Sequence, residues 1–275
     1  MEHNGRLLGT FIATKEHRRF VEFANAVRKH RYIGLCYGPA GVGKTLSARR
    51  YAHWDLIEPF IEQGAREHPE RAEICATLAR SRAVFHTPTV LGTLRDLRET
   101  LDTRMFHVNT CIDGHLHQDE TGFQVIDLGA RHIEMLIFDE AERLSVTAIE
   151  FIRDIYDRTG VGVILIGMPG MEKRLERYPQ FYSRVGFAHH YRPLTGDELS
   201  FVLTRHWRAL GVDLDGADFT DAQAVASIAR ITGGNFRLLH RLFTQIERIM
   251  KINELTVITD DVVEAARSTL VVGLA

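Results

Sequence analysis

The first residues in this chain that suggest chemistry form a glycine-rich loop ending in a lysine. Residues 38–45 fit the phosphate-binding pattern G-x-x-x-x-G-K-[ST] at every fixed position. Such glycines let backbone N–H groups turn toward an anion, and the start of the following helix adds positive partial charge. We expect Lys44 to reach the β- and γ-phosphates of a nucleotide and Thr45 to hold Mg²⁺. The residues expected to contact the nucleotide are Gly38, Pro39, Ala40, Gly41, Val42, Gly43, Lys44, Thr45 and Leu46.

An acidic pair supplies the second half of such a site. The run 133–138 predicts a buried strand, and Asp139 and Glu140 follow it directly. A phosphate loop at the end of one strand needs an acidic group at the end of a neighbouring strand to complete the metal site. We expect Asp139 to hold Mg²⁺ through water and Glu140 to orient or deprotonate the attacking water. The structural alternative is a strand that merely ends in a surface acidic pair.

Two arginines are placed to offset the charge that develops on the γ-phosphate during hydrolysis. Arg237 begins a predicted helix near the C-terminus, and a domain closing over the nucleotide could carry it inward. Arg184 precedes the last predicted strand, where a neighbouring subunit could use it. Spacing alone leaves each arginine equally compatible with a structural salt bridge.

The elements that must position these residues follow from hydrophobic periodicity. Alternating strands and helices up to about residue 192 predict an α/β fold with a parallel sheet flanked by helices. Strands are expected at 32–37, 83–87, 133–138, 161–166 and 186–191. Leu94, Leu97, Leu101 and Met105 mark a helix with a core-facing stripe. Residues 107–130 are expected to form an irregular polar insertion or two short elements.

After Pro193 the pattern predicts helices only. They are expected at about 196–210, 220–231, 235–251 and 260–270, with Thr195, Thr220 and Thr259 as candidate N-caps. The chain is therefore expected to have three parts. These are an N-terminal arm at 1–13, a nucleotide-binding α/β core at 14–192, and a small all-helical lid at 193–275.

Composition limits the function classes. Lys plus Arg number 34 and Asp plus Glu number 36, so the chain lacks the overall positive charge of a typical nucleic-acid-binding protein. Any DNA contact must come from a local patch or from many subunits that each contribute a few charges. Three cysteines do not make a disulfide framework, which indicates a reducing, cytoplasmic compartment. Since no apolar run approaches the length of a membrane span, we expect no membrane association.

Taken together, these motifs resemble those of AAA+ ATPases. The loop at 38–45, the strand ending in Asp139-Glu140, Arg184 and the turn before Arg237 look like that family's Walker A, Walker B, arginine finger and sensor 2. The resemblance implies ATP and Mg²⁺ as cofactors and Lys44, Glu140, Arg184 and Arg237 as the catalytic set.

Met168 departs from the family pattern, because members commonly have a polar residue, sensor 1, at this position. A thioether is a poor hydrogen-bond partner. Fast intrinsic hydrolysis is therefore not expected.

A narrower resemblance lies in residues 134–144 followed by 152–157, which are similar to the TniB/TnsC transposition regulators and more distantly to MuB and IstB. This resemblance implies that the protein forms a homo-oligomer, as a ring or helical filament, on double-stranded DNA. The oligomer would select the target site and recruit a transposase, and a target-selector protein would be a further partner. The DNA-contacting residues of such proteins lie around the helix after the second strand. The corresponding positions here are Thr93, Arg95, Arg98 and Arg104. A near-neutral subunit suits this role, because a polymer multiplies weak phosphate contacts.

Two other function classes remain open. A P-loop kinase would explain the phosphate loop, although it would not explain the acidic pair together with a separate helical lid. An interaction module that binds ATP as a switch and barely hydrolyses it would suit Met168. The sequence leaves open the number of subunits, the partner transposase and the target-site rule.

Overall fold

The computed structural model describes residues 11–62, 69–116 and 132–270. The chain divides into two compact units. The sheet unit comprises the described residues of 19–39 and 44–191. The helical unit comprises the described residues of 1–18, 40–43 and 192–275. Most of the expected N-terminal arm lies outside the described residues.

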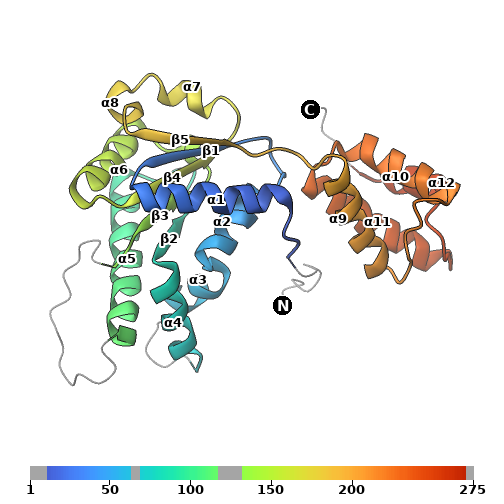
Figure 1. The fold of residues 1–275 in the computed structure, drawn as a ribbon, viewed down its shortest axis with the longest axis horizontal. Helices are drawn as coiled ribbons and strands as arrows, with labels where there is room; N and C mark the ends of the chain where they lie inside the picture. Colours follow the sequence, from blue (N-terminus) through green and yellow to red (C-terminus); the bar gives the residue numbers. More distant parts are fainter. Residues whose placement is uncertain (1–10, 63–68, 117–131, 271–275) are drawn as a thin grey trace. The chain divides into compact units, whose positions relative to one another are not determined.

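The sheet unit contains five parallel strands in the order β2-β3-β4-β1-β5 (Figure 1). The strands are β1 Ile33–Tyr37, β2 Ala83–His86, β3 Met135–Phe138, β4 Gly162–Gly167 and β5 Val185–His190. The first residue of β1, Ile33, lies opposite Val163 of β4 on one side and Val185 of β5 on the other. Strands β2, β3 and β4 are buried along their whole length, which explains the apolar sequences of β3 and β4 and of β2 as far as the buried His86. The parallel α/β prediction is confirmed.

Helices flank this sheet (Figure 1). They are α1 Lys15–His30, α2 Lys44–Ala52, α3 Trp54–Glu62, α4 Arg71–Ser81, α5 Leu94–Leu116, α6 Val146–Thr159, α7 Met171–Leu175 and α8 Pro179–Tyr182, with a short 3₁₀ turn, η1, at Ala141–Arg143. Helix α1 packs closely on β1, since a Cβ on Gly34 would lie 2.5 Å from Val27 and 2.7 Å from Phe23. Glycine at position 34 therefore permits this helix–sheet contact.

One expectation for the sheet unit is wrong. Helix α5 does not end near Met105 but continues to Leu116, through the first ten residues of the expected insertion. The buried stripe of Leu101 and Met105 continues in further side chains at helical spacing, Val108, Cys111 and Ile112. The polar residues between them lie on the other side of the helix and obscure this period in the sequence. The rest of the expected insertion lies outside the described residues.

The helical unit contains α9 Asp197–Ala209, α10 Phe219–Thr232, α11 Phe236–Ile252 and α12 Asp260–Ser268. Its core is built from apolar residues of all four helices, among them the fully buried Trp207, Ile228, Leu242 and Val263. The predicted helical C-terminal region is therefore present. No helix among the described residues is long and apolar enough to cross a membrane.

Two of the three expected N-caps in this unit are wrong. Thr259 does cap α12 through its hydroxyl. Helix α10 is instead capped by the carboxylate of Asp218, so Thr220 lies inside the first turn. An anionic cap also interacts favourably with the positive end of the helix, which a hydroxyl does not. Helix α9 follows Gly196 without a side-chain cap, so Thr195 does not have the expected role.

The helical unit should lose stability in mild acid because of His206. This ring stacks on Phe243 with centroids 4.5 Å apart, and burial, followed by the nearby His240, lowers the pKa of His206. The unfolded chain therefore binds a proton at His206 below about pH 6.5 while the folded chain resists it, so folding free energy is lost as pH falls through that value. We expect denaturant midpoints at pH 7.5 and 5.5 to differ less in His206→Phe than in the wild type. His240→Gln, which leaves the partial burial of His206 unchanged, should retain most of the difference. An equal reduction in both variants would contradict this assignment.

Candidate functional site

The glycine loop connects β1 to α2 at the carboxyl end of the sheet. Its first residue, Gly38, donates its N–H to the carbonyl of Gly167 at the end of β4, with 3.3 Å between the atoms. A Cβ at position 38 would lie 2.2 Å from the carbonyl oxygen of Tyr191, so only glycine fits there. Gly41 and Gly43 adopt φ angles of +77° and +109°, which favour glycine. The loop thus has the backbone that an anion-binding turn requires.

Lys44 begins α2 and is buried. Its ammonium donates to the carbonyl oxygens of Gly38 and Pro39, at 2.6 and 2.7 Å. The positive charge is therefore held at the loop, where backbone amides and the start of α2 also favour an anion. This arrangement fits a nucleotide phosphate.

Thr45 and Asp139 are brought together although they are 94 residues apart in the sequence. The Thr45 hydroxyl donates to Oδ2 of Asp139 at 2.6 Å, and the other oxygen of Asp139 accepts from the backbone N–H of Glu140 at 3.0 Å. Burial raises the pKa of Asp139 above its ordinary value, against the effect of the hydrogen bond from Thr45. A divalent cation would offset this cost of burying the carboxylate. A hydroxyl and a carboxylate are oxygen ligands of the kind that Mg²⁺ prefers, so the pair fits that ion.

Glu140 is the second residue after β3 and has a φ of +49°, an uncommon value for a residue with a side chain. Its carboxylate forms an ion pair with Arg143 at the end of η1. Arg143 also donates to the carbonyl oxygen of Pro88, at 3.0 Å. Arg143 is not among the site residues predicted from the sequence, although its spacing of three residues from Glu140 is a signal that could have identified it.

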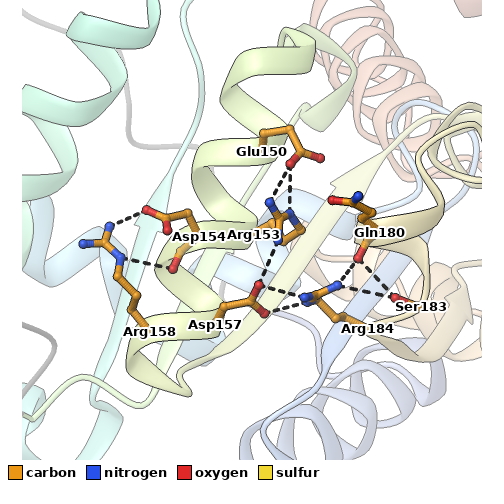
Figure 2. Close-up of polar contacts among 8 residues, drawn as sticks. All are labelled: Glu150, Arg153, Asp154, Asp157, Arg158, Gln180, Ser183 and Arg184. Carbon is orange, nitrogen blue, oxygen red and sulfur yellow. Dashed lines mark hydrogen bonds and ion pairs between the residues drawn. The ribbon is translucent and has the colours of Figure 1, made fainter.

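Arg184 immediately precedes β5 and is tied to α6 (Figure 2). Its Nε and Nη2 donate to the two carboxylate oxygens of Asp157, at 2.5 and 2.8 Å, and it also contacts the carbonyl of Gln180. Asp157 accepts a further hydrogen bond from Arg153, at 3.0 Å, and Arg153 pairs in turn with Glu150. The hydrogen bond from Arg184 lowers the pKa of Asp157. The guanidinium is therefore held in one orientation while part of it stays exposed.

Arg237 lies in the first turn of α11, within the helical unit. Asn235 caps this helix by accepting from the backbone N–H of Arg237 and Leu238. In the same unit, the Arg237 N–H donates to the carbonyl of Gly41 at 3.0 Å, and the Asn235 amide donates to the carbonyl of Ala40 at 2.7 Å. The capping role of Asn235 is not among the predictions from the sequence, although asparagine directly before an apolar periodic run is a helix-start signal.

The four residues predicted to contact DNA differ in how exposed their side chains are and in which partners they already have. Arg95 and Arg98 are exposed on α5 and pair with Glu99 and Asp102, one turn on. Thr93 caps the start of α5 by a reciprocal pair of hydrogen bonds with Asp96.

Arg104 is placed differently from the other three. It donates to the carbonyl of Phe85 at 2.7 Å, pairs with Glu58 and lies over the ring of Trp54. Its side chain is only 18% exposed, so we do not propose Arg104 as a DNA contact.

The amino-acid sequence matches one family model and one curated relative. The model, described as an AAA domain, matches residues 27–175. The relative is described as a potential ATP-binding protein of Staphylococcus aureus. It is 41% identical over 275 residues, which cover 96% of this chain and 97% of that protein.

Several solved structures share the fold at lower identity. RuvB of Thermotoga maritima, described as a Holliday junction branch migration motor, has a TM-score of 0.55 at 18% identity, covering 93% of this chain and 69% of that one. The ORC2 protein of Aeropyrum pernix in its ADP form has a TM-score of 0.57 at 13% identity, covering 98% and 71%. CDC6P of Pyrobaculum aerophilum has a TM-score of 0.55 at 15% identity, covering 95% and 68%. At these identities the likeness concerns the fold alone.

Proposed function

Because this chain belongs to the AAA domain family and is an AAA+ ATPase that uses ATP and Mg²⁺, we propose that it regulates DNA transposition in the manner of the TniB/TnsC proteins. In this proposal it assembles as a homo-oligomer on double-stranded DNA, selects the target site and recruits a transposase. The observation that carries the proposal is the stretch 134–144 with 152–157, which resembles those regulators and forms β3, η1 and part of α6.

Residues of the sheet unit would bind the nucleotide and its metal ion. Lys44 would exchange its two carbonyl partners for phosphate oxygens and bring a full positive charge to them. Thr45 and Asp139 would supply oxygen ligands, directly or through water. Bound Mg²⁺ supplies positive charge that offsets the negative charge of the phosphate oxygens.

Three charged residues would act on the reaction itself. Glu140 would orient the attacking water and accept its proton. Arg237 would act from the helical unit, and Arg184 would act on the nucleotide of a neighbouring subunit, each stabilising negative charge that develops in the transition state. What supports the role of Arg184 is its fixed orientation on Asp157 together with its partial exposure.

The start of α5 is the surface that we propose for DNA contact in the sheet unit. The side chains of Arg95 and Arg98 are 84% and 69% exposed. Their ion pairs with Glu99 and Asp102 are exposed and therefore weak, so a phosphate group can replace the carboxylate. One subunit would bind weakly, whereas an oligomer multiplies the contacts along the duplex.

Replacing both Arg95 and Arg98 by alanine should weaken duplex binding about equally for all DNA sequences. Each lost phosphate contact should also reduce the slope of log K against log salt by about one. Fluorescence anisotropy over a range of salt concentrations measures both effects. Arg158→Ala is the matched control, because Arg158 is an exposed arginine that pairs with Asp154 one turn away. If Arg158→Ala weakens binding equally, α5 has no special role.

Electron microscopy of the protein on long duplex DNA tests the assembly. With a slowly hydrolysed ATP analogue we expect filaments or stacked rings along the DNA, and none without nucleotide. Bare DNA beside dispersed protein would remove the DNA proposal and leave an AAA+ ATPase of unknown substrate. A subsequent pull-down with a transposase tests the partner.

A second candidate function is an ATP-switched interaction module with very slow hydrolysis. The observation that favours it is Met168, which follows β4 directly and is 40% exposed. A thioether has no hydrogen to donate to the γ-phosphate and offers only a weak acceptor to the attacking water. Turnover in the presence and absence of DNA distinguishes the two functions, since the switch would remain nearly inactive in both.

A further inference from the structure

Two of the three cysteines lie in direct contact within the sheet unit. Cys75 belongs to α4 and Cys111 to α5, two helices that pack against each other (Figure 1). Their thiols form a hydrogen bond, and both residues are buried, with 6% and 2% of their surfaces exposed. The continuation of α5 to Leu116 is what places Cys111 beside α4. Two thiols in contact are the starting arrangement for a disulfide.

The two thiols differ in how readily they ionise. The hydrogen bond from Cys111, with help from the positive charge of Arg71 and against the effect of burial, lowers the pKa of Cys75 to about 7. The same hydrogen bond, followed by burial, raises the pKa of Cys111, so Cys111 keeps its proton. Near neutral pH a large fraction of Cys75 is therefore thiolate, the form of cysteine that attacks electrophiles. The more exposed of the two residues is thus also the better nucleophile.

We propose that Cys75 and Cys111 form a redox modification site, at which a hydroperoxide oxidises the two thiols to a disulfide that ties α4 to α5. Cys75 is the attacking residue and Cys111 the resolving residue. A disulfide requires the sulfurs to approach to about 2 Å, closer than in a hydrogen bond, so the two side chains must turn toward each other. Disulfides in reducing compartments are usually transient and redox-sensing, which agrees with the compartment expected from the sequence.

The oxidation proceeds in two steps. First, the Cys75 thiolate attacks one peroxide oxygen, so that a sulfur–oxygen bond forms and the oxygen–oxygen bond breaks. The leaving alkoxide takes a proton from water and departs as an alcohol, and Cys75 becomes a sulfenic acid. Second, the sulfur of Cys111 attacks the sulfur of Cys75, the sulfur–oxygen bond breaks, and the hydroxide leaves as water with the proton of Cys111. Together the two thiols lose two protons and two electrons, and the hydroperoxide is reduced to an alcohol and water.

The disulfide would act on the stability of the sheet unit. The segment between the two cysteines, residues 76–110, contains β2 and most of α5. A cross-link that closes such a loop removes conformational entropy from the unfolded chain and therefore favours the folded chain. It would also protect Cys75 from further oxidation to the sulfinic acid, which is irreversible for most proteins.

The test is mass spectrometry of the wild-type protein after treatment with hydrogen peroxide, alkylation of the remaining thiols and digestion. We expect the intact monomer to lose the mass of two hydrogen atoms, and the digest to contain the Cys75 peptide linked to the Cys111 peptide. A reducing agent should reverse both changes. The oxidised protein should melt about 5 °C or more above the reduced protein, because the closed loop is long.

Two variants identify the sulfurs that take part. Cys36→Ala is the matched control, because Cys36 is also buried in the sheet unit but lies in β1. It should form the same link and show the same rise in melting temperature. Cys111→Ser should form no link and show no rise. Its Cys75 should instead accumulate as the sulfenic acid, which dimedone traps, and then as the sulfinic acid.

The inference is overturned if peroxide-treated native protein yields Cys75 and Cys111 without a link between them, or if the link forms only in protein unfolded in urea. An equal rise in melting temperature in Cys111→Ser also overturns it, because the rise would then have another origin. The wild-type digest requires no substitution, so the test does not depend on the folding of a variant. Since these measurements involve neither ATP nor DNA, a negative result leaves the proposed function intact.

Discussion

Glu140→Gln is expected to lower the rate of ATP hydrolysis about 10²-fold or more while leaving ATP binding nearly unchanged. The amide keeps the size and planar shape of the carboxylate but does not accept a proton at neutral pH. The carboxylate of Glu140 pairs with Arg143, whereas Lys44 and Thr45 are held by other partners, the carbonyls of Gly38 and Pro39 and the carboxylate of Asp139. Binding of a fluorescent ATP analogue, measured beside turnover, separates the two effects.

Glu142→Gln is the matched control for this variant. Glu142 is an exposed carboxylate in the same 3₁₀ turn, two residues after Glu140. The Glu142→Gln variant should hydrolyse ATP at the wild-type rate, whereas the Lys44→Ala variant should lose nucleotide binding itself. A Glu140→Gln variant with wild-type turnover would show that Glu140 is not the base and would favour the ATP-switched module.

The strands of the sheet could be predicted because each one leaves its own signal in a short stretch of the sequence. Strands β2, β3 and β4 are buried on both faces, so their sequences are short apolar runs bounded by polar residues or turns. The end of α5 could not be predicted in the same way. Val108 and Ile112 continue its buried stripe, but three histidines and other polar residues follow Met105 and make that segment look irregular. Tertiary packing decided the length of that helix.

The same distinction holds at the candidate site. The glycine loop and the acidic pair could be predicted because each requires particular residue types at fixed spacing, and the structure brings Thr45 and Asp139 within hydrogen-bond distance. The partners of the arginines could not be predicted in this way. Asp157 lies 27 residues before Arg184, and nothing in the sequence marks it among the other acidic residues of α6. Such pairs depend on how α6 packs beside α8 and the residue that precedes β5, which periodicity does not specify.

Arg184→Ala is expected to reduce turnover by the assembled protein about 10³-fold, the lower end of what an arginine finger contributes. ATP binding by each subunit should persist, because the side-chain hydrogen bonds of Arg184 to the described residues go to Asp157, Gln180 and Ser183 and not to the glycine loop. Arg177→Ala, which removes an exposed arginine shortly before it, should leave turnover unchanged. Asp157→Asn should give an intermediate loss, since Arg184 then keeps its charge but loses the bidentate pair that orients it.

Mixing two inactive variants shows whether Arg184 acts across a subunit interface. Arg184→Ala keeps the nucleotide site but lacks the guanidinium, whereas Lys44→Ala loses the site but keeps Arg184. If Arg184 serves the neighbouring subunit, the nucleotide site of an Arg184→Ala subunit is completed by the guanidinium of an adjacent Lys44→Ala subunit. The mixture should then recover turnover well above the sum of the two variants alone. If Arg184 acts within its own subunit, or only anchors β5 to α6, no mixed interface is complete and the rates simply add. Hydrolysis measured over a range of mixing ratios on duplex DNA therefore distinguishes a catalytic role in a neighbouring site from a structural one, because a salt bridge inside one subunit cannot be supplied by another.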